Sequence, residues 1–252
     1  MSQVIDNSLV SMGTTNFGFS GASLDDLESS EYTIVTIAVD ISSSVSGFRQ
    51  QLEECLQTIV ESCQRSPRSE NLLIRLVSFN NDVNEVHGFR ILSNIQLDSY
   101  DNSLNPRGCT SLYDAVLASI EATQAYGTLL ADQDYFANGV IYVITDGADN
   151  ASTHSPTDIR NAIEAIRIDE DGLESLSVIL IGVGYGNVSS YLDGFRTDAT
   201  IDQFVDMTDL FNESNPATAL AKLAGYISRS ISTTSMALQN GTSSPASSIL
   251  LF

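Results

Sequence analysis

Three short segments of the sequence carry carboxylate and hydroxyl side chains in a pattern that suits metal chemistry. Their candidate ligands are Asp40, Ser42, Ser44, Thr110 and Asp146. Sets of oxygen ligands with few full charges favour Mg²⁺, Mn²⁺ or Ca²⁺ over zinc or copper. We therefore expect a Mg²⁺ site, with Mn²⁺ or Ca²⁺ as alternatives. An exchangeable position on such a metal can accept an acidic group from a partner protein.

The elements that must position these residues follow from the apolar pattern. Nearly unbroken apolar runs, typical of strands buried on both faces, occupy residues 32–40, 72–79, 139–146 and 176–184. Shorter strands are predicted at 86–92 and 201–206, and helices at 48–63, 110–126, 156–168, 188–195 and 216–232. This alternation predicts an α/β fold, a doubly wound, mostly parallel sheet with helices on both faces. Ligands bind outside the carboxyl ends of such strands, where we expect the three segments to meet.

At these residues the sequence resembles the von Willebrand factor type A (vWA) family. Asp40-x-Ser42-x-Ser44, Thr110 in a Gly-x-Thr turn and Asp146 in Thr-Asp-Gly match the five-position metal-ion-dependent adhesion site (MIDAS) of that family. The resemblance implies a Rossmann-like vWA fold with an intact MIDAS. It also implies that the first four residues surround the metal, some through water, and that Asp146 acts through water.

The resemblance covers about residues 32–232 and carries an expectation about function. Ser43, where many relatives have Gly, is a minor departure. The segment Thr-Asp-Gly-Ala-Asp-Asn is more similar to intracellular bacterial vWA proteins than to integrin inserted domains. Such relatives act as adaptors beside MoxR-type AAA+ ATPases or in multiprotein assemblies. The resemblance therefore implies a non-enzymatic module that captures a Glu or Asp side chain of a partner.

Composition excludes several other functions. Acids outnumber bases by 32 to 11, so the formal net charge is −21 and nucleic acid or anionic membrane is repelled. The single lysine, Lys222, precedes Leu223 rather than Ser or Thr, which excludes a Walker A phosphate loop. No apolar run reaches the roughly 18 residues of a membrane span. Three unpaired cysteines and no recognisable secretory signal lead us to expect a cytoplasmic protein.

The chain divides into three predicted parts. Residues 1–31 form an acidic flexible leader, 32–233 the vWA domain, and 234–252 an uncharged Ser/Thr-rich tail with an apolar end. Scattered apolar residues of the leader, Phe19 among them, are candidates for docking on a partner. The uncharged tail motivates an alternative function as a structural subunit of a larger particle. A metal-dependent phosphoesterase is the weaker alternative, because the ligand set lacks a visible general base and a phosphate-binding basic cluster.

Some of these residues also allow simpler interpretations. Asp40 and Ser42 could merely cap the following helix, since such side chains satisfy free backbone N–H groups. Arg107 could steer a partner's carboxylate or be an ordinary solvated or salt-bridged residue. Cys109 is expected to be buried and inert, with sensitivity to oxidation as the alternative. The two histidines are assigned structural or surface roles.

Overall fold

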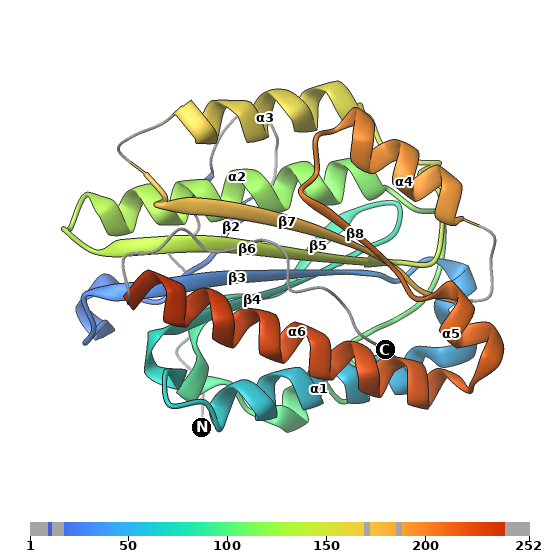
Figure 1. The fold of residues 1–252 in the computed structure, drawn as a ribbon, viewed down its shortest axis with the longest axis horizontal. Coiled ribbons are helices and arrows are strands. Elements are labelled where there is room, and N and C mark those ends of the chain that lie inside the picture. The colour runs from blue at the N-terminus through green and yellow to red at the C-terminus, as the bar shows by residue number, and fades with distance from the viewer. Residues whose placement is uncertain (1–9, 12–17, 169–171, 185–187, 240–252) are drawn as a thin grey trace.

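A computed structural model of the chain describes residues 10–11, 18–168, 172–184 and 188–239. The strands of its central sheet are β3 (Glu31–Asp40), β4 (Leu72–Phe79), β5 (Val83–Ile91), β6 (Phe136–Thr145), β7 (Ser175–Gly182) and β8 (Gln203–Asp206). The six strands lie in the order β5-β4-β3-β6-β7-β8, and every neighbouring pair is parallel except β4 and β5. The doubly wound, mostly parallel α/β fold predicted from the sequence is confirmed (Figure 1).

Helices cover both faces of the sheet. The longer helices are α1 (Arg49–Gln64), α2 (Leu112–Ala131), α3 (Pro156–Ile168), α4 (Ser189–Asp198) and α6 (Pro216–Gln239), with the short α5 (Thr208–Glu213) between β8 and α6. Helices α1 and α6 lie side by side on one face, and α2, α3 and α4 lie on the other (Figure 1). A short 3-10 helix, η2 (Ser43–Phe48), connects β3 to α1.

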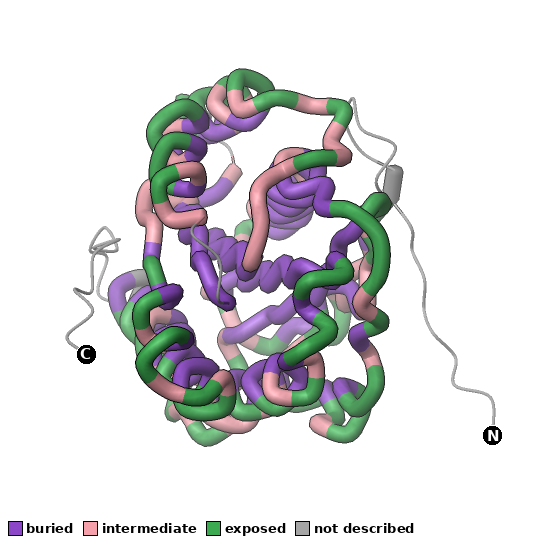
Figure 2. Tube along the Cα trace, turned by 90° about the vertical axis from the view of Figure 1, so that its right-hand side faces the viewer, coloured by how far each residue is buried: buried purple, intermediate pink, exposed green. Residues whose placement is uncertain are grey.

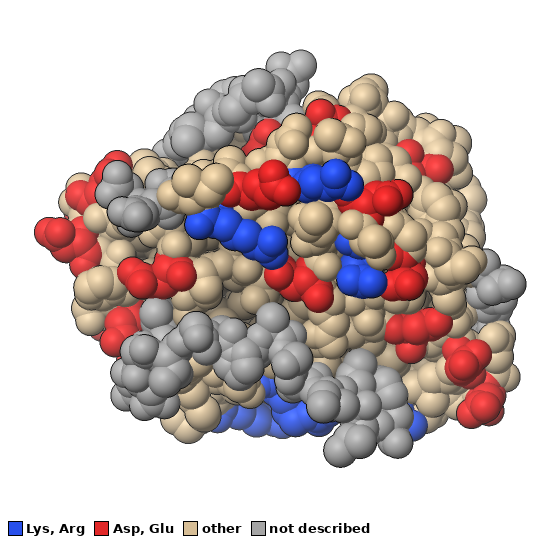
Figure 3. All heavy atoms as spheres, turned by 45° about the horizontal axis from the view of Figure 1, so that its top comes forward, with Lys and Arg blue, Asp and Glu red and all other residues tan. Residues whose placement is uncertain are grey.

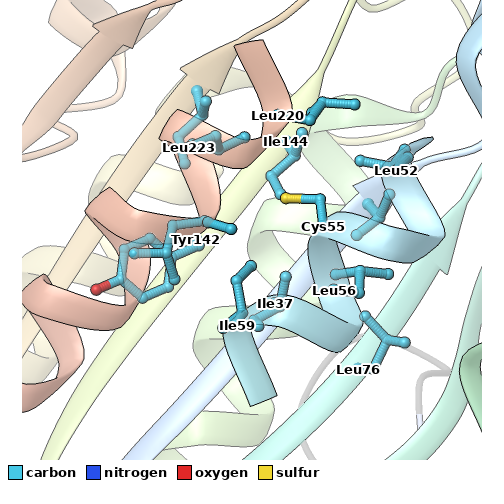
Figure 4. Close-up of a cluster of buried hydrophobic side chains, with 14 of the residues drawn as sticks. Ile37, Leu52, Cys55, Leu56, Ile59, Leu76, Tyr142, Ile144, Leu220 and Leu223 are labelled. Carbon is cyan, nitrogen blue, oxygen red and sulfur yellow. The ribbon is translucent and has the colours of Figure 1, made fainter. Parts of the chain in front are cut away.

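Successive side chains of each central strand enter opposite core layers, because side chains alternate across a strand. On β3, Ile37 packs into the layer beneath α1 and α6, whereas Ala38 packs toward α2. Both layers are apolar, which explains the nearly continuous apolar runs in the sequence. Figure 4 shows the first layer, formed by Leu52, Cys55, Leu56 and Ile59 of α1, Leu220 and Leu223 of α6, and Ile37, Leu76, Tyr142 and Ile144 of the sheet.

Three elements differ from the prediction. Strand β5 begins at Val83 and runs antiparallel to β4, because the connection between them is too short for the crossover that parallel strands need. Helix α5 has no counterpart among the predicted elements. Helix α6 continues to Gln239, since no Gly or Pro interrupts its last turns. It therefore runs past the predicted end of the domain at residue 233, and the rest of the predicted tail, 240–252, lies outside the described residues.

The described part of the predicted leader packs on the domain. A short pair of strands, β1 (Val10–Ser11) and β2 (Gly18–Phe19), precedes the sheet. The Phe19 ring is buried and makes edge contacts with the rings of Phe89 and Tyr126. The Phe89 N–H donates to the Ser20 carbonyl at 2.8 Å. The buried aromatic ring and this backbone hydrogen bond hold the segment around Phe19 against the domain, which was not expected of a flexible leader.

Charges of both signs alternate on the surface around α3. Figure 3 shows arginine groups beside carboxylates on this face. Two ion pairs of this part of the molecule are Arg167–Asp202, at 2.7 Å, and Arg196–Asp193, at 2.9 Å. Among the described residues, we find no helix whose length and apolar character together would allow it to cross a membrane.

Candidate functional site

The three candidate segments meet at the carboxyl edge of the sheet, on the right of Figure 1 and facing the viewer in Figure 2. Figure 2 shows the buried strands end-on between the more exposed helices. Asp40 is the last residue of β3 and Thr145 the last of β6, and these strands are neighbours. Thr110 stands two residues before α2. Parallel pairing thus brings together loops that are far apart in the sequence.

Asp40 lies at the buried floor of the site, with 1% of its surface exposed. Its Oδ1 accepts a hydrogen bond from the Ser42 N–H at 2.7 Å, and its Oδ2 accepts one from the Thr145 hydroxyl at 2.6 Å. Burial raises the pKa of Asp40 to about 6, despite these hydrogen bonds, and the nearby Asp146 carboxylate adds to the rise. Both carboxylate oxygens are therefore fixed in position by neutral donors.

The two serines connect the first loop to the third. The hydroxyls of Ser42 and Ser44 lie 3.0 Å apart, and the Ser44 hydroxyl donates to Asp146 Oδ1 at 2.9 Å. Burial also raises the pKa of Asp146, and these serine hydroxyls oppose the rise. Ser42 does occupy the N-cap position of η2, but its side chain makes no capping hydrogen bond. The simple helix-capping interpretation of Ser42 is therefore wrong.

Thr110 brings the second loop to the third. Its backbone N–H donates to Asn150 Oδ1 at 2.8 Å, and its carbonyl accepts the Asn150 N–H at 3.0 Å and the Ala151 N–H at 3.1 Å. A Cβ atom placed on Gly147 would lie 3.6 Å from the Thr110 hydroxyl oxygen. The hydroxyl of this buried threonine therefore faces the turn that directly follows Asp146.

The first and second loops are joined through the backbone of Gly108. The Ser43 N–H donates to the Gly108 carbonyl at 3.2 Å, and the Arg107 N–H donates to the Ile41 carbonyl at 2.8 Å. Gly108 has a φ of +77°, a left-handed conformation that other residues adopt only with strain. This glycine therefore permits the turn that places Thr110 beside the other two loops.

The donor set has a clear electrostatic character. It consists of two carboxylates and three hydroxyls, and no cation is among the groups that shift the pKa of Asp40 or Asp146. Desolvated negative charges without a cationic partner destabilise the folded protein. Among the described residues, no group of three or more His, Cys, Asp or Glu side chains could hold a metal. These hard oxygen donors therefore fit a divalent cation such as Mg²⁺ better than zinc or copper.

Sequence reasoning assigned no role to the residues that support the ligand set. Thr145 orients Asp40, Asn150 anchors Thr110, and the Asn81 side chain accepts the Cys109 N–H at 3.1 Å. The only sequence signal for the role of Thr145 was its position at a strand end, next to Asp146, because a hydroxyl there can reach the neighbouring strand. Cys109 was expected to be buried but is exposed, because the turn points it away from the core.

The two histidines make structural hydrogen bonds. The Asp114 carboxylate accepts the backbone N–H groups of Thr153 and His154 and contacts His154 Nδ1 at 2.7 Å, which fastens the third loop to α2. His87 lies between the Gly88 carbonyl, at 2.9 Å, and the Tyr100 hydroxyl, at 2.8 Å. Both histidines are therefore engaged outside the candidate ligand set.

Comparisons with known proteins agree with this fold. The chain matches the family model described as the von Willebrand factor type A domain over residues 35–220. No curated protein sequence matches it significantly. Among solved structures, a point mutant of the PilB minor pilin from Streptococcus sanguinis is similar with a TM-score of 0.59 and 16% identity, over 82% of this chain and 63% of that one.

Two further structures have similar folds. A von Willebrand factor type A protein from Catenulispora acidiphila has a TM-score of 0.54 and 14% identity, over 80% of this chain and 43% of that one. The pilus adhesin SpaC from Lactobacillus rhamnosus GG, in its open conformation, has a TM-score of 0.54 and 11% identity, over 81% and 30% respectively. The chain thus spans less than two thirds of each of these proteins, and at such identities the likeness concerns the fold alone.

The match to the family model covers most of the chain. It includes the six-stranded sheet from within β3 to β8 and all three loops of the candidate site. The architecture agrees, since the sheet is mostly parallel and carries helices on both faces. The chain therefore belongs to the von Willebrand factor type A domain family.

Proposed function

We propose that this protein is a metal-dependent protein-binding module. Its metal site consists of Asp40, Ser42, Ser44, Thr110 and Asp146, with Mg²⁺ as the expected ion and Mn²⁺ or Ca²⁺ as alternatives. When bound, the ion supplies a coordination position that a Glu or Asp side chain of a partner can fill. The observation that carries the proposal is the hydrogen-bonded series from Ser42 through Ser44 to Asp146, which joins two loops far apart in the sequence.

The supporting residues favour this function. Thr145 and the Ser42 backbone hold both oxygens of Asp40, as hydrogen-bonding neighbours of a metal ligand typically do. Exposure increases from the buried Asp40 to the partly buried Asp146 and the exposed Ser44. A partner side chain can therefore approach from the side of Ser44 and Asp146, while the floor of the site stays shielded from water.

We propose binding rather than catalysis at this site. Phosphoryl transfer relies on several cationic groups around the phosphate. In the described site loops, 40–47, 105–111 and 145–154, Arg107 is the only lysine or arginine. The phosphoesterase alternative would regain support if the protein turned over a generic phosphate ester with Mg²⁺ and lost this activity on Asp146→Ala.

The resemblance suggests a cytoplasmic adaptor whose partner is a MoxR-type AAA+ ATPase, and we keep this as the first candidate. A subunit of a larger assembly is the second, because two proteins of similar fold are a minor pilin and a pilus adhesin. Their low identity limits that support to the fold. An AAA+ ATPase among co-purifying chains favours the adaptor, whereas particles visible by electron microscopy favour the assembly.

Affinity purification from the native host tests metal-dependent binding. The full chain serves as bait in Mg²⁺ and in EDTA, beside Asp40→Asn and the control Asp98→Asn, which changes an exposed acid outside the site. We expect one set of partners to be captured by the full chain and the control in Mg²⁺, and to be lost in EDTA and with Asp40→Asn. If the same partners are captured in EDTA and by Asp40→Asn, the proposed function is contradicted.

A further inference from the structure

We propose that Arg107 is a second anchor for the partner, so that the partner presents two carboxylates, one to the metal site and one to Arg107. This inference rests on the proposed metal-dependent binding. It adds the charge pattern of the partner, a segment with two acidic side chains rather than one.

Arg107 lies on the rim of the site. Its backbone N–H donates to the Ile41 carbonyl, and the next residue, Gly108, accepts hydrogen bonds from the N–H and the hydroxyl of Ser43 at 3.2 and 3.1 Å. Thr110 follows three residues later, a stretch that spans at most about 10 Å. These backbone hydrogen bonds fix Arg107 beside two of the three site loops. Its side chain is exposed to solvent.

The guanidinium of Arg107 has no ion-pair partner among the described residues. This is unusual in a chain where acids outnumber bases by 32 to 11. Six of the ten arginines form ion pairs with Asp or Glu. Three other arginines form no such pair in the described structure. Arg160 donates to the Asp198 carbonyl, Arg90 lies toward the opposite end of the sheet, and Arg229 lies in the second half of α6. Arg107 is therefore the unpaired arginine of the site edge.

The charge balance of the site favours an added positive group. Asp40 and Asp146 carry two negative charges, which a divalent cation neutralises. A partner carboxylate then leaves one negative charge in excess, on a protein whose formal net charge is already −21. Arg107 offsets this charge from the rim.

Geometry favours a second carboxylate for Arg107. A guanidinium binds a carboxylate best through two parallel N–H···O bonds, which need both carboxylate oxygens. A carboxylate that ligates the metal has an oxygen already engaged. A second acidic side chain of the partner leaves both of its oxygens for Arg107.

Selection of short random peptides displayed on phage tests the inference. The full chain, Arg107→Gln and the control Arg90→Gln are each used as bait in Mg²⁺, and bound phage are released with EDTA. Arg90→Gln removes the same charge from an exposed arginine away from the site. We expect the full chain and the control to select peptides with two acidic residues at a preferred spacing, and Arg107→Gln to select peptides with one.

The affinity for one selected peptide measures how much the Arg107 contact contributes to binding. Replacing its second acidic residue by the corresponding amide should weaken binding to the full chain about threefold to fivefold, the range of an exposed ion pair, and leave binding to Arg107→Gln unchanged. Titration with Mg²⁺ alone should give the same affinity for both proteins, which shows that the metal site is intact.

Two outcomes separate the inference from the function on which it rests. If Arg107→Gln selects the same diacidic peptides and binds them equally well, the role of Arg107 is overturned while metal-dependent binding stands. If no bait yields acidic peptides that EDTA releases, the proposed function itself is contradicted, and the inference with it.

Discussion

Strand β3 begins and ends with a carboxylate, and the two ends are held in different ways. At the amino end, Glu31 forms an ion pair with Arg68 at 3.1 Å, and Arg68 also donates to the Ser235 hydroxyl at 2.9 Å. Asn71 donates to the Glu31 carbonyl at 2.9 Å. At the carboxyl end, Asp40 receives hydrogen bonds from neutral groups only. One edge of the sheet is balanced in charge within the chain, and the other is not.

Hydrogen bonds from neutral groups do not fully offset the effect of burial on an ionisable group. Burial raises the pKa of Asp40 to about 6 and lowers that of His87 to about 4, so each group shifts toward its uncharged form. His87 is satisfied when neutral. Asp40 sits beside Asp146, and a cation that joins both would restore the charged form. The unbalanced edge is therefore suited to binding, and the balanced edge to stability.

Adding Mg²⁺ should produce the largest change, because it supplies the charge that the carboxyl edge lacks. At a concentration about 100 times the dissociation constant, binding stabilises the folded protein by about 2.7 kcal/mol. For a chain of this size, the melting temperature should rise by roughly 5–10 °C. Scanning calorimetry with and without EDTA measures the rise. Asp146→Ala should abolish it and Asp98→Asn should keep it; an equal rise in both variants contradicts the proposed site.

Neutralising one carboxylate at each edge should have opposite effects in EDTA. Asp40→Asn removes an uncompensated buried charge, so we expect the free energy of unfolding at pH 7 to increase by about 1–2 kcal/mol. Arg68→Gln breaks the Glu31 ion pair and should decrease it by about 1 kcal/mol. Urea unfolding measures both. The comparison fails if the two variants are destabilised alike.

Protonation of His87 should weaken the fold in acid. Its pKa is about 4 in the folded protein against about 6.5 unfolded, so the unfolded state binds the proton more tightly over this range. Stability is therefore lost as the pH falls, by about 2 kcal/mol between pH 7 and pH 5. Asp40, whose folded pKa is raised, acts in the opposite direction without metal.

Urea unfolding of the full chain and of His87→Asn at both pH values isolates this effect. The contribution of Asp40 is present in both proteins and cancels in the difference between them. A loss of stability that is the same in His87→Asn would assign the pH dependence to other groups.

The smallest effect concerns the turn that joins two of the site loops. Gly108→Ala places a Cβ on a left-handed backbone and 2.1 Å from the side-chain oxygen of Asn81, so we expect a loss of about 1 kcal/mol and weaker Mg²⁺ binding. Gly47→Ala is the matched control, because its Cβ would meet no atom within 4 Å. Thermal unfolding and Mg²⁺ titration should separate the variants, and equal behaviour would show that the turn tolerates a side chain.

The sequence predicted the interior strands well and their pairing only in part. The predicted strand at 72–79 coincides with β4, because a strand buried on both faces leaves an unmistakable apolar run. The antiparallel direction of β5 depends on its pairing, and α5 is too short for a clear periodic pattern. Both were therefore missed.

In the candidate site, the proposed ligand residues could be predicted from the sequence, whereas the residues that support them could not. Asp40, Ser42, Ser44 and Asp146 are joined directly or through one another by hydrogen bonds, as their positions after predicted strands suggested. Metal binding by them stays a prediction. The role of Thr145 depends on β6 being the neighbour of β3, and that of Asn81 on a contact between distant loops. Local patterns in a sequence do not encode such contacts.

The segment that packs against β5 has a consequence for how the protein behaves among its own copies. Strand β5 ends the sheet on one side, and a bare edge strand offers unpaired backbone groups to other chains. The Phe89 carbonyl accepts the Ala22 N–H, and the Phe89 N–H donates to the Ser20 carbonyl. The Ser20 N–H donates to the Glu85 carboxylate at 3.0 Å. On the other side, the edge strand β8 is only 4 residues long. The molecule thus covers part of one edge strand and keeps the other short, and both features limit aggregation through the sheet edges.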